Sequence, residues 1–360
     1  MTSNKAGHLR ALHTHHIRRG AVVSRCLQLL VICLSCGFGS ATAASDKSLA
    51  ELLEQGVQSQ LQGDYDRSSQ IAQQMKANFP TNAIGNAFEM NTLVTRLSWD
   101  TTDTQFDGAL ESEAKGALKL CKQQIRRDPD AAAGYHLCGQ AHFALTFLYA
   151  ARGSYYSAGR HSSKTIEQLE AALERDPNLA DAKMHLGATY YYADNLPPFV
   201  KAISRFLWFI PTGNSEKALP YMRDAAENGE YLGDAAKFIF ADLVMSSEPT
   251  LLEEAGAYLT NLVRRYPANR RFQLKHMQYL AQTERYPELL NAVDSFTGPE
   301  HCCPVASVDE SIARLWRIRA YLALNDQGTA ELEFASIDTA DLPEWGQQWH
   351  SKLGQQLAAR

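Results

Sequence analysis

Apolar side chains along most of the chain are spaced three and four residues apart, as at Leu169, Ala172 and Leu173. This spacing places them on one face of a helix, whereas few segments show the alternation with period two that is typical of a strand. The pattern therefore predicts an all-α fold made of consecutive helices.

Proline-containing turns interrupt the helical pattern at intervals. They are Phe79 to Asn82, Asp128 to Asp130, Asp176 to Asn178 and Tyr266 to Asn269. Proline cannot continue a helix, and the Asp or Asn beside it can cap the next one. Because successive prolines are 49, 48 and 90 residues apart, with the last spacing close to two periods, the turns predict a repeated pair of helices.

With these turns, the chain resembles the tetratricopeptide repeat family, whose unit of about 34 residues is a helix pair with small residues where the helices cross. The marks of that family are Gly56, Gly63, Tyr65 and Pro80 in the first unit, and Gly139 and Gly187 in later units. The resemblance implies a right-handed α-solenoid of antiparallel helix pairs, clearest over residues 48–290. The longer period of this chain predicts extended helices or turns.

The last part of the chain has weaker repeat marks. Ser307 to Leu324 and Gly328 to Ile337 have the pattern of one more helix pair, and Pro343 to Leu357 that of a terminal capping helix. We therefore expect residues 305–358 to complete the same array, so that residues 44–360 form one helical domain.

Residues 1–43 differ in character from the rest. They hold five Lys and Arg residues and no acidic residue, followed by an apolar run from Cys26 to Cys36 and then by small residues. This order is typical of a secretory signal peptide, and Ala41-Thr42-Ala43 fits its cleavage rule. A membrane anchor is the alternative, but the apolar run is shorter than the roughly 20 residues that a bilayer requires. The sequence therefore predicts export to the periplasm or to the periplasmic face of the envelope.

Removal of this leader makes the chain more acidic. The whole sequence has 35 Lys and Arg against 40 Asp and Glu residues, and five of the 35 lie in the leader, so the net charge changes from −5 to about −10. The remaining arginine pairs are isolated. Because nucleic-acid binding requires clustered cations that neutralise phosphates, we expect no nucleic-acid partner.

The resemblance also implies a concave groove. Carried over position by position, its lining is Asn91, Val94, His136, Gln140, Phe143, Asp181, Met184 and Tyr191. This surface is polar, aromatic and nearly uncharged, so it lacks the several Lys or Arg residues that clamp a terminal carboxylate. It therefore favours a peptide segment or a protein surface as the partner. The alternative is that these side chains pack between neighbouring helices.

The most apolar segment after the leader follows Pro197 and Pro198. Phe199, Ile203, Phe206 and Trp208 recur along it, and Lys201 and Arg205 lie on the other side of the predicted helix. Such a helix is typical of an interface with a partner or with a membrane surface. Packing between repeats is the interpretation that the pattern favours over a partner or a membrane surface.

Four cysteines follow the leader: Cys121, Cys138, Cys302 and Cys303. Cys121 and Cys138 fall on inward positions of successive predicted helices, where they can form a disulfide or remain as two buried thiols. The adjacent pair Cys302 and Cys303 beside His301 favours a loop disulfide or structural thiols. A soft-metal site or a redox role there is a weaker alternative, because no second ligand cluster accompanies it.

Motifs that carry catalysis are absent from the sequence. It contains no H-E-x-x-H, G-x-S-x-G, P-loop or dinucleotide fingerprint, so we expect neither an enzyme nor a cofactor or metal. The predicted function is a non-enzymatic, exported scaffold or adaptor that holds another protein in its groove, in envelope assembly or transport. The alternative is a lipid-binding or organic-acid-binding component of a transporter, with an apolar pocket around Tyr190 to Trp208.

Overall fold

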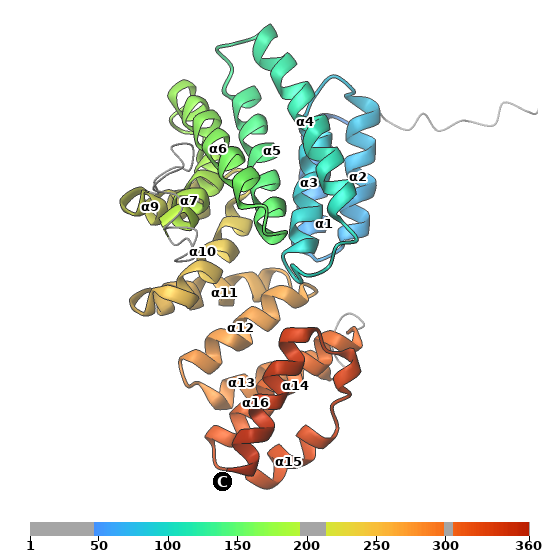
Figure 1. The fold of residues 1–360 in the computed structure, drawn as a ribbon, viewed down its shortest axis with the longest axis vertical. Coiled ribbons are helices and arrows are strands. Elements are labelled where there is room, and N and C mark those ends of the chain that lie inside the picture. The colour runs from blue at the N-terminus through green and yellow to red at the C-terminus, as the bar shows by residue number, and fades with distance from the viewer. Residues whose placement is uncertain (1–46, 195–213, 299–304, 360) are drawn as a thin grey trace, which may run out of the picture. The chain divides into compact units, whose positions relative to one another are not determined.

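The computed structural model describes residues 47–194, 214–298 and 305–359, and it is helical throughout (Figure 1). These residues contain fifteen α-helices, two short 3-10 helices and no strand, which confirms the predicted all-α fold. The α-helices are α1 (Leu49–Leu61), α2 (Tyr65–Asn78), α3 (Ile84–Leu97), α4 (Asp107–Arg127), α5 (Ala132–Ala151), α6 (Tyr155–Arg175), α7 (Ala180–Asp194), α9 (Ser215–Asn228), α10 (Gly233–Ser247), α11 (Leu252–Arg265), α12 (Arg270–Gln282), α13 (Tyr286–Thr297), α14 (Ser307–Ala323), α15 (Gln327–Ala335) and α16 (Glu344–Ala358). The 3-10 helices are η1 (Pro249–Leu251) and η2 (Thr339–Asp341).

The proline-containing turns lie where the sequence predicts them. Each separates two helices: α2 from α3, α4 from α5, α6 from α7, and α11 from α12. Their polar residues act in two ways. Asn269 caps α12 by accepting from the N–H groups of Arg271 and Phe272, as expected of a residue beside proline. The carboxylates of Asp128 and Asp176 instead accept from the N–H two residues further on, which closes the turn itself.

The long repeat period is explained by helix length. Helices α4, α5 and α6 contain 21, 20 and 21 residues, so two such helices and their turns exceed the roughly 34 residues of a standard helix pair. Consecutive helices pack against each other along these repeats (Figure 1). Between Pro129 and Pro177 the extension therefore lies in the helices. Between Pro80 and Pro129 it is shared by α4 and by the connection of residues 98–106, because α3 has only 14 residues.

Glycines permit the close helix crossings that the repeat pattern predicts. A Cβ atom on Gly139 of α5 would lie 2.5 Å from Cδ2 of Leu169 on α6. A Cβ atom on Gly187 of α7 would lie 2.7 Å from the carbonyl oxygen of Ala218 on α9, and a backbone atom cannot move aside as a side chain can. Around these crossings the buried apolar side chains form large clusters, one across α3 to α5 and another from Leu169 of α6 to α16.

A contact between distant parts of the sequence joins α1 to α11 and α12. Leu61, at the end of α1, is buried in a cluster with Leu262, Tyr266 and Phe272. Beside it, Nδ2 of Asn269 donates to the carbonyl oxygen of Leu61 at 2.9 Å. No local pattern in the sequence indicates this contact.

The last helices of the described residues lie where the sequence predicts helices. Helices α14, α15 and α16 match the expected helix pair and terminal helix to within a few residues, and α16 packs against both α14 and α15. Three expectations lie outside the described residues: the signal peptide of residues 1–43, the segment with Phe199, Ile203, Phe206 and Trp208, and the pair Cys302 and Cys303. Among the helices that the structure describes, none is both long and apolar enough to cross a membrane.

Candidate functional site

Hydrogen bonds join the side chains of three predicted groove residues. Asn91 on α3 donates through Nδ2 to Oε1 of Gln140 on α5, at 3.0 Å. The Gln140 amide nitrogen lies 2.8 Å from Nε2 of His136, one turn earlier on α5, and donates to it. Burial lowers the pKa of His136 to about 4, so the ring is neutral at pH 7 and can accept this bond. The structure thus brings Asn91, Gln140 and His136 together between α3 and α5.

A second histidine lies beside this chain of hydrogen bonds. The ring of His185 on α7 is 6.4 Å from that of His136 and 4.9 Å, edge to face, from that of Phe143. Burial lowers the pKa of His185 to about 3, and its buried Nδ1 has no hydrogen-bond partner among the described residues. The polar region that the sequence analysis selects therefore includes a neutral histidine that it did not select.

Val94 packs partly buried against the cluster of α3 to α5. Three further predicted groove residues are buried on α7: Asp181, Met184 and Tyr191. The carboxylate of Asp181 accepts from the N–H groups of Tyr231 and Leu232 at 3.1 Å, at the start of α10. The hydroxyl of Tyr191 forms a hydrogen bond with that of Ser247, at the end of α10. These side chains hold α7 against α10, and a ligand would have to displace those contacts to reach them.

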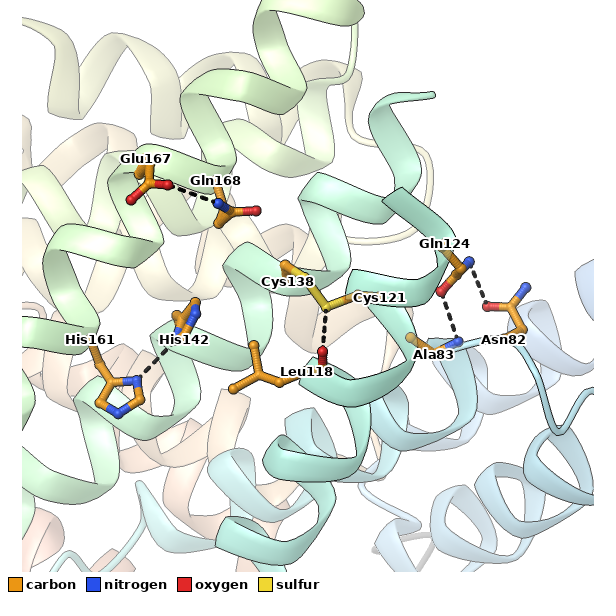
Figure 2. Close-up of a disulfide and its surroundings, with 10 residues drawn as sticks. All are labelled: Asn82, Ala83, Leu118, Cys121, Gln124, Cys138, His142, His161, Glu167 and Gln168. Atoms are coloured by element: carbon orange, nitrogen blue, oxygen red, sulfur yellow. Dashed lines mark hydrogen bonds between the residues drawn. A yellow bond between two sulfur atoms is a disulfide. The ribbon is translucent and has the colours of Figure 1, made fainter. Parts of the chain in front are cut away.

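The predicted cysteine pair is bonded. Cys121 on α4 and Cys138 on α5 form a disulfide that joins the two helices (Figure 2). Both residues are at most 1% exposed, so the bond lies in the core between repeats. This contact favours the disulfide over the alternative of two buried thiols.

A pair of histidines lies close to this disulfide (Figure 2). The Nδ1 atoms of His142 on α5 and His161 on α6 are 2.9 Å apart, so one donates and the other accepts. Burial, together with the neighbouring His161, lowers the pKa of His142 to about 3. The pair is uncharged at pH 7, and no group of three metal-ligating side chains occurs in the residues that the structure describes.

The most distinctive surface feature is a cleft lined by tryptophans. The sequence has five tryptophans, and all four that the structure describes line this cleft: Trp99, Trp316, Trp345 and Trp349. Trp99 follows α3, Trp316 lies on α14, and Trp345 and Trp349 lie one turn apart on α16. The cleft has a volume of about 300 Å³. We call it the tryptophan cleft.

Helix α12 supplies the polar wall of the tryptophan cleft. Arg271, Leu274, Lys275 and Gln278 are spaced three and four residues apart and therefore share one face of α12. The ammonium group of Lys275 lies 2.5 Å from Oδ1 of Asp242 on α10 and 2.9 Å from Oε1 of Gln278. Hydrogen-bonding side chains thus lie beside the indole rings.

Arg271 connects this wall to the segment that carries Trp99. Its guanidinium donates to the carbonyl oxygen of Thr95 and, at 2.9 Å, to the hydroxyl of Ser98. It also lies 5.1 Å from the centre of the Trp99 ring, within the range of a cation–π contact. No carboxylate lies within ion-pair distance of Arg271 in the described ranges. The position of Trp99 therefore depends on a residue of α12.

A second hollow of about 320 Å³ adjoins the first. Ser98, Trp99 and Trp345 line both, and the second is completed by residues 100–102, Glu344 and Gln348. Oδ1 of Asp100 accepts from the backbone N–H and the hydroxyl of Thr102, at 2.9 and 2.6 Å, which fixes the turn after α3. The two hollows are neighbouring compartments of one aromatic cleft.

The sequence pattern does not predict this cleft. Its four tryptophans come from three segments of the chain, and the first and the last of them are more than 200 residues apart. None of the four tryptophans falls on a position that the repeat pattern places on a concave face. The only signal in the sequence is the pair Trp345 and Trp349, which a four-residue spacing places on one face of the terminal helix. That face meets α14 through an edge-to-face contact of Trp349 with Trp316, with ring centres 4.3 Å apart.

A scan against protein-family models finds no match to this chain, and a search of curated proteins finds none either.

Proposed function

We propose that this protein is a non-enzymatic adaptor that binds a segment of another protein in the tryptophan cleft. The observation that carries the proposal is the convergence of Trp99, Trp316, Trp345 and Trp349 on one cleft. Tryptophan is enriched among the residues that dominate binding energy, because a large rigid ring loses little conformational entropy when it is covered. Trp345 is 41% exposed, so part of this aromatic surface is open to a partner.

The two compartments support a chain-like ligand. They share Trp99 and Trp345 as walls, so one molecule can place neighbouring groups on either side of them. An extended peptide presents alternate side chains on one face, which suits two adjacent hollows with hydrogen-bonding groups between them. Gln278 and Gln348 provide such groups, one in each compartment.

The predicted groove residues have a supporting role in this proposal. Asn91, His136 and Gln140 hydrogen-bond to one another, and Asp181 and Tyr191 bond to residues near α10. They fix α3, α5 and α7, and α3 ends directly before Trp99. We therefore place the partner on the tryptophan cleft instead of on these positions.

Export and a tetratricopeptide-like architecture belong to the same proposal. The leader pattern of residues 1–43 supports export, and the disulfide of Cys121 with Cys138 suits an oxidising compartment such as the periplasm. The repeated turns, the close glycine crossings and the sequential helix packing support a right-handed solenoid of antiparallel pairs. In this setting the protein would act as a scaffold in the cell envelope.

Selection of peptides tests the proposal. Random 12-residue peptides displayed on phage are selected on the purified full-length chain, and the affinity of the selected peptides is measured by tryptophan fluorescence. We expect Trp345→Leu to weaken binding about tenfold or more, because it removes an aromatic anchor. The matched control is Tyr156→Leu, an aromatic on α6 that is 57% exposed and lies outside the cleft. Equal effects of both substitutions would contradict the proposal.

A small-molecule ligand is a second candidate, because about 300 Å³ is within the size range of small-molecule pockets. Native mass spectrometry of the purified chain distinguishes the two candidates. A stoichiometric organic molecule that is lost in Trp345→Leu, but kept in Tyr156→Leu, favours the small ligand.

A further inference from the structure

The compartment beyond Trp99 differs in charge from the rest of the tryptophan cleft. Its lining includes two carboxylates, those of Asp100 and Glu344, and no Lys, Arg or His. The first compartment is lined by Arg271 and Lys275 and by a single carboxylate, that of Asp242. The cleft therefore changes from cationic to anionic across Trp99 and Trp345.

Indole rings make this acidic compartment suited to a cation. Among aromatic residues, tryptophan attracts a cation over its face most strongly, because of the quadrupole of its ring. Trp99 already shows this property within the chain, since the Arg271 guanidinium lies 5.1 Å from its ring centre. The guanidinium of Arg152 also lies beside the second compartment, where it donates to the carbonyl oxygen of Thr101, but it forms an ion pair with Asp107. The two carboxylates of this compartment therefore stand against one guanidinium without a carboxylate partner among the described residues, that of Arg271, so the balance of charge there favours a cation.

The combination of apolar walls and carboxylates in the lining favours a basic side chain over a bare ion. Lys and Arg have apolar stems that pack along hydrophobic surface while the charged end remains near polar groups. Here the indoles of Trp99 and Trp345 provide the apolar walls, and the carboxylates of Asp100 and Glu344 lie in the same hollow. Glu344 and Trp345 are exposed, so a side chain can enter from solvent.

The adjoining compartment indicates where the rest of such a ligand lies. Because both compartments share Ser98, Trp99 and Trp345, a peptide whose basic side chain enters the acidic compartment has its neighbouring side chain beside the first. The net charge of about −10 after the leader also attracts a cationic ligand at long range.

We propose that the compartment lined by Trp99, Trp345, Asp100 and Glu344 recognises a Lys or Arg side chain of the bound segment. This inference rests on the proposed function, because it assigns one side chain of the peptide that the tryptophan cleft holds. It predicts a preference for basic segments that depends on the two carboxylates.

Two peptide libraries test this preference. Both are 12-residue phage libraries that are random at every position except one central position, which is Lys in one and Glu in the other. After selection in parallel on the full-length chain, we expect the Lys library to be enriched about tenfold or more over the Glu library. On the double variant Asp100→Asn and Glu344→Gln the ratio should fall to about twofold or less. The amide keeps the oxygen that accepts from Thr102, so the turn after α3 is retained.

The control changes the net charge equally at a distance from the cleft. Glu167→Gln and Glu331→Gln remove two exposed carboxylates on α6 and α15 that do not line either compartment. With this control the Lys preference should equal that of the unmodified chain. If the Lys preference falls equally in the control and in the Asp100 and Glu344 variant, the preference arises from overall charge and the inference is overturned.

The remaining outcomes separate this inference from the proposed function. Equal enrichment of both libraries, with binding that still depends on Trp345, overturns the basic side chain and leaves the peptide-binding function intact. No enrichment of either library contradicts the peptide-binding function itself. Tetramethylammonium tests the source of the cation. If this small cation displaces the selected peptides at a concentration as low as the dissociation constants of the peptides, a free small cation is the ligand and the inference is wrong.

Discussion

Asn269 and Leu61 are 208 positions apart in the sequence, yet Nδ2 of Asn269 donates to the carbonyl oxygen of Leu61 at 2.9 Å in a buried environment. The same side chain accepts from the N–H groups of Arg271 and Phe272 and so caps α12. One residue therefore begins the helix that supplies the polar wall of the tryptophan cleft and attaches that helix to α1.

Removing Asn269 should cost more than removing an ordinary cap. Asn269→Ala loses the cap, worth about 1 kcal/mol, and leaves the Leu61 carbonyl buried without its donor, which costs about 1–3 kcal/mol more. The control is Asn214→Ala, because Asn214 caps α9 through the N–H of Lys217. We expect a loss of about 1 kcal/mol there, measured by urea unfolding. Equal losses in the two variants would show that the contact with Leu61 contributes nothing.

Arg271 should determine how Trp99 is held. In Arg271→Lys the charge remains, but the planar fork that reaches Thr95 and Ser98 and lies near the Trp99 ring is lost. We expect stronger acrylamide quenching of tryptophan fluorescence and several-fold weaker binding of the selected peptides. Arg319→Lys is the control, since Arg319 lies 6.0 Å from the Trp316 ring and does not line the cleft. Unchanged quenching in Arg271→Lys would contradict this role.

The disulfide between Cys121 and Cys138 should stabilise the fold by restricting the unfolded chain. Its ends are 17 positions apart, and a loop of that length corresponds to about 3 kcal/mol. The double variant Cys121→Ala and Cys138→Ala should lose about this much free energy of unfolding. Dithiothreitol present during unfolding should lower the stability of the unmodified chain to a similar level and leave the variant unchanged. If dithiothreitol lowers the stability of both proteins equally, its effect arises from other cysteines.

The buried histidines should make the fold sensitive to acid. Burial lowers the pKa of His136 to about 4 and those of His142 and His185 to about 3, whereas in the unfolded chain each is near 6.5. Between these values the unfolded chain binds more protons, so stability is full above about pH 6.5 and falls as the pH drops toward 4. At pH 5 each histidine should account for about 2 kcal/mol of loss.

Urea unfolding at pH 7.5 and pH 5 measures this effect. In a variant with His142→Gln and His185→Gln, the loss between the two pH values should shrink by about 4 kcal/mol, which is twice the loss for one histidine. The same loss in this variant as in the unmodified chain would mean that the acid sensitivity arises elsewhere.

The fold was predicted well where the signal is local. Turns at Pro80, Pro129, Pro177 and Pro267 separate helices because proline disfavours helix continuation and an Asp or Asn lies close to each, whereas Pro220, without this context, lies inside α9. Gly187 marks a crossing because no side chain fits beside Ala218. Contacts between distant segments leave no such signal. The sequence around Asn269 predicts a helix cap, but it does not indicate the contact of Asn269 with Leu61.

The proposed binding surface is the part that the sequence does not indicate. Asp181 and Tyr191 occupy positions that face a groove in a regular repeat, but here their polar groups bond to residues near α10. Trp99 and Trp345 lie outside any repeat position, and they come together only because α12 and α16 pack near the end of α3. Their shared role depends on tertiary packing.

Photo-cross-linking from two positions tests the central claim most directly. A photoreactive aromatic residue, which keeps a ring at the anchor position, replaces Trp345 in one full-length variant and Tyr191, which is 7% exposed, in another; each is irradiated with the selected peptides. The account predicts a discrete peptide adduct from position 345 and little from position 191. An adduct from position 191 with none from position 345 would contradict it and return the binding site to the concave positions of the repeats.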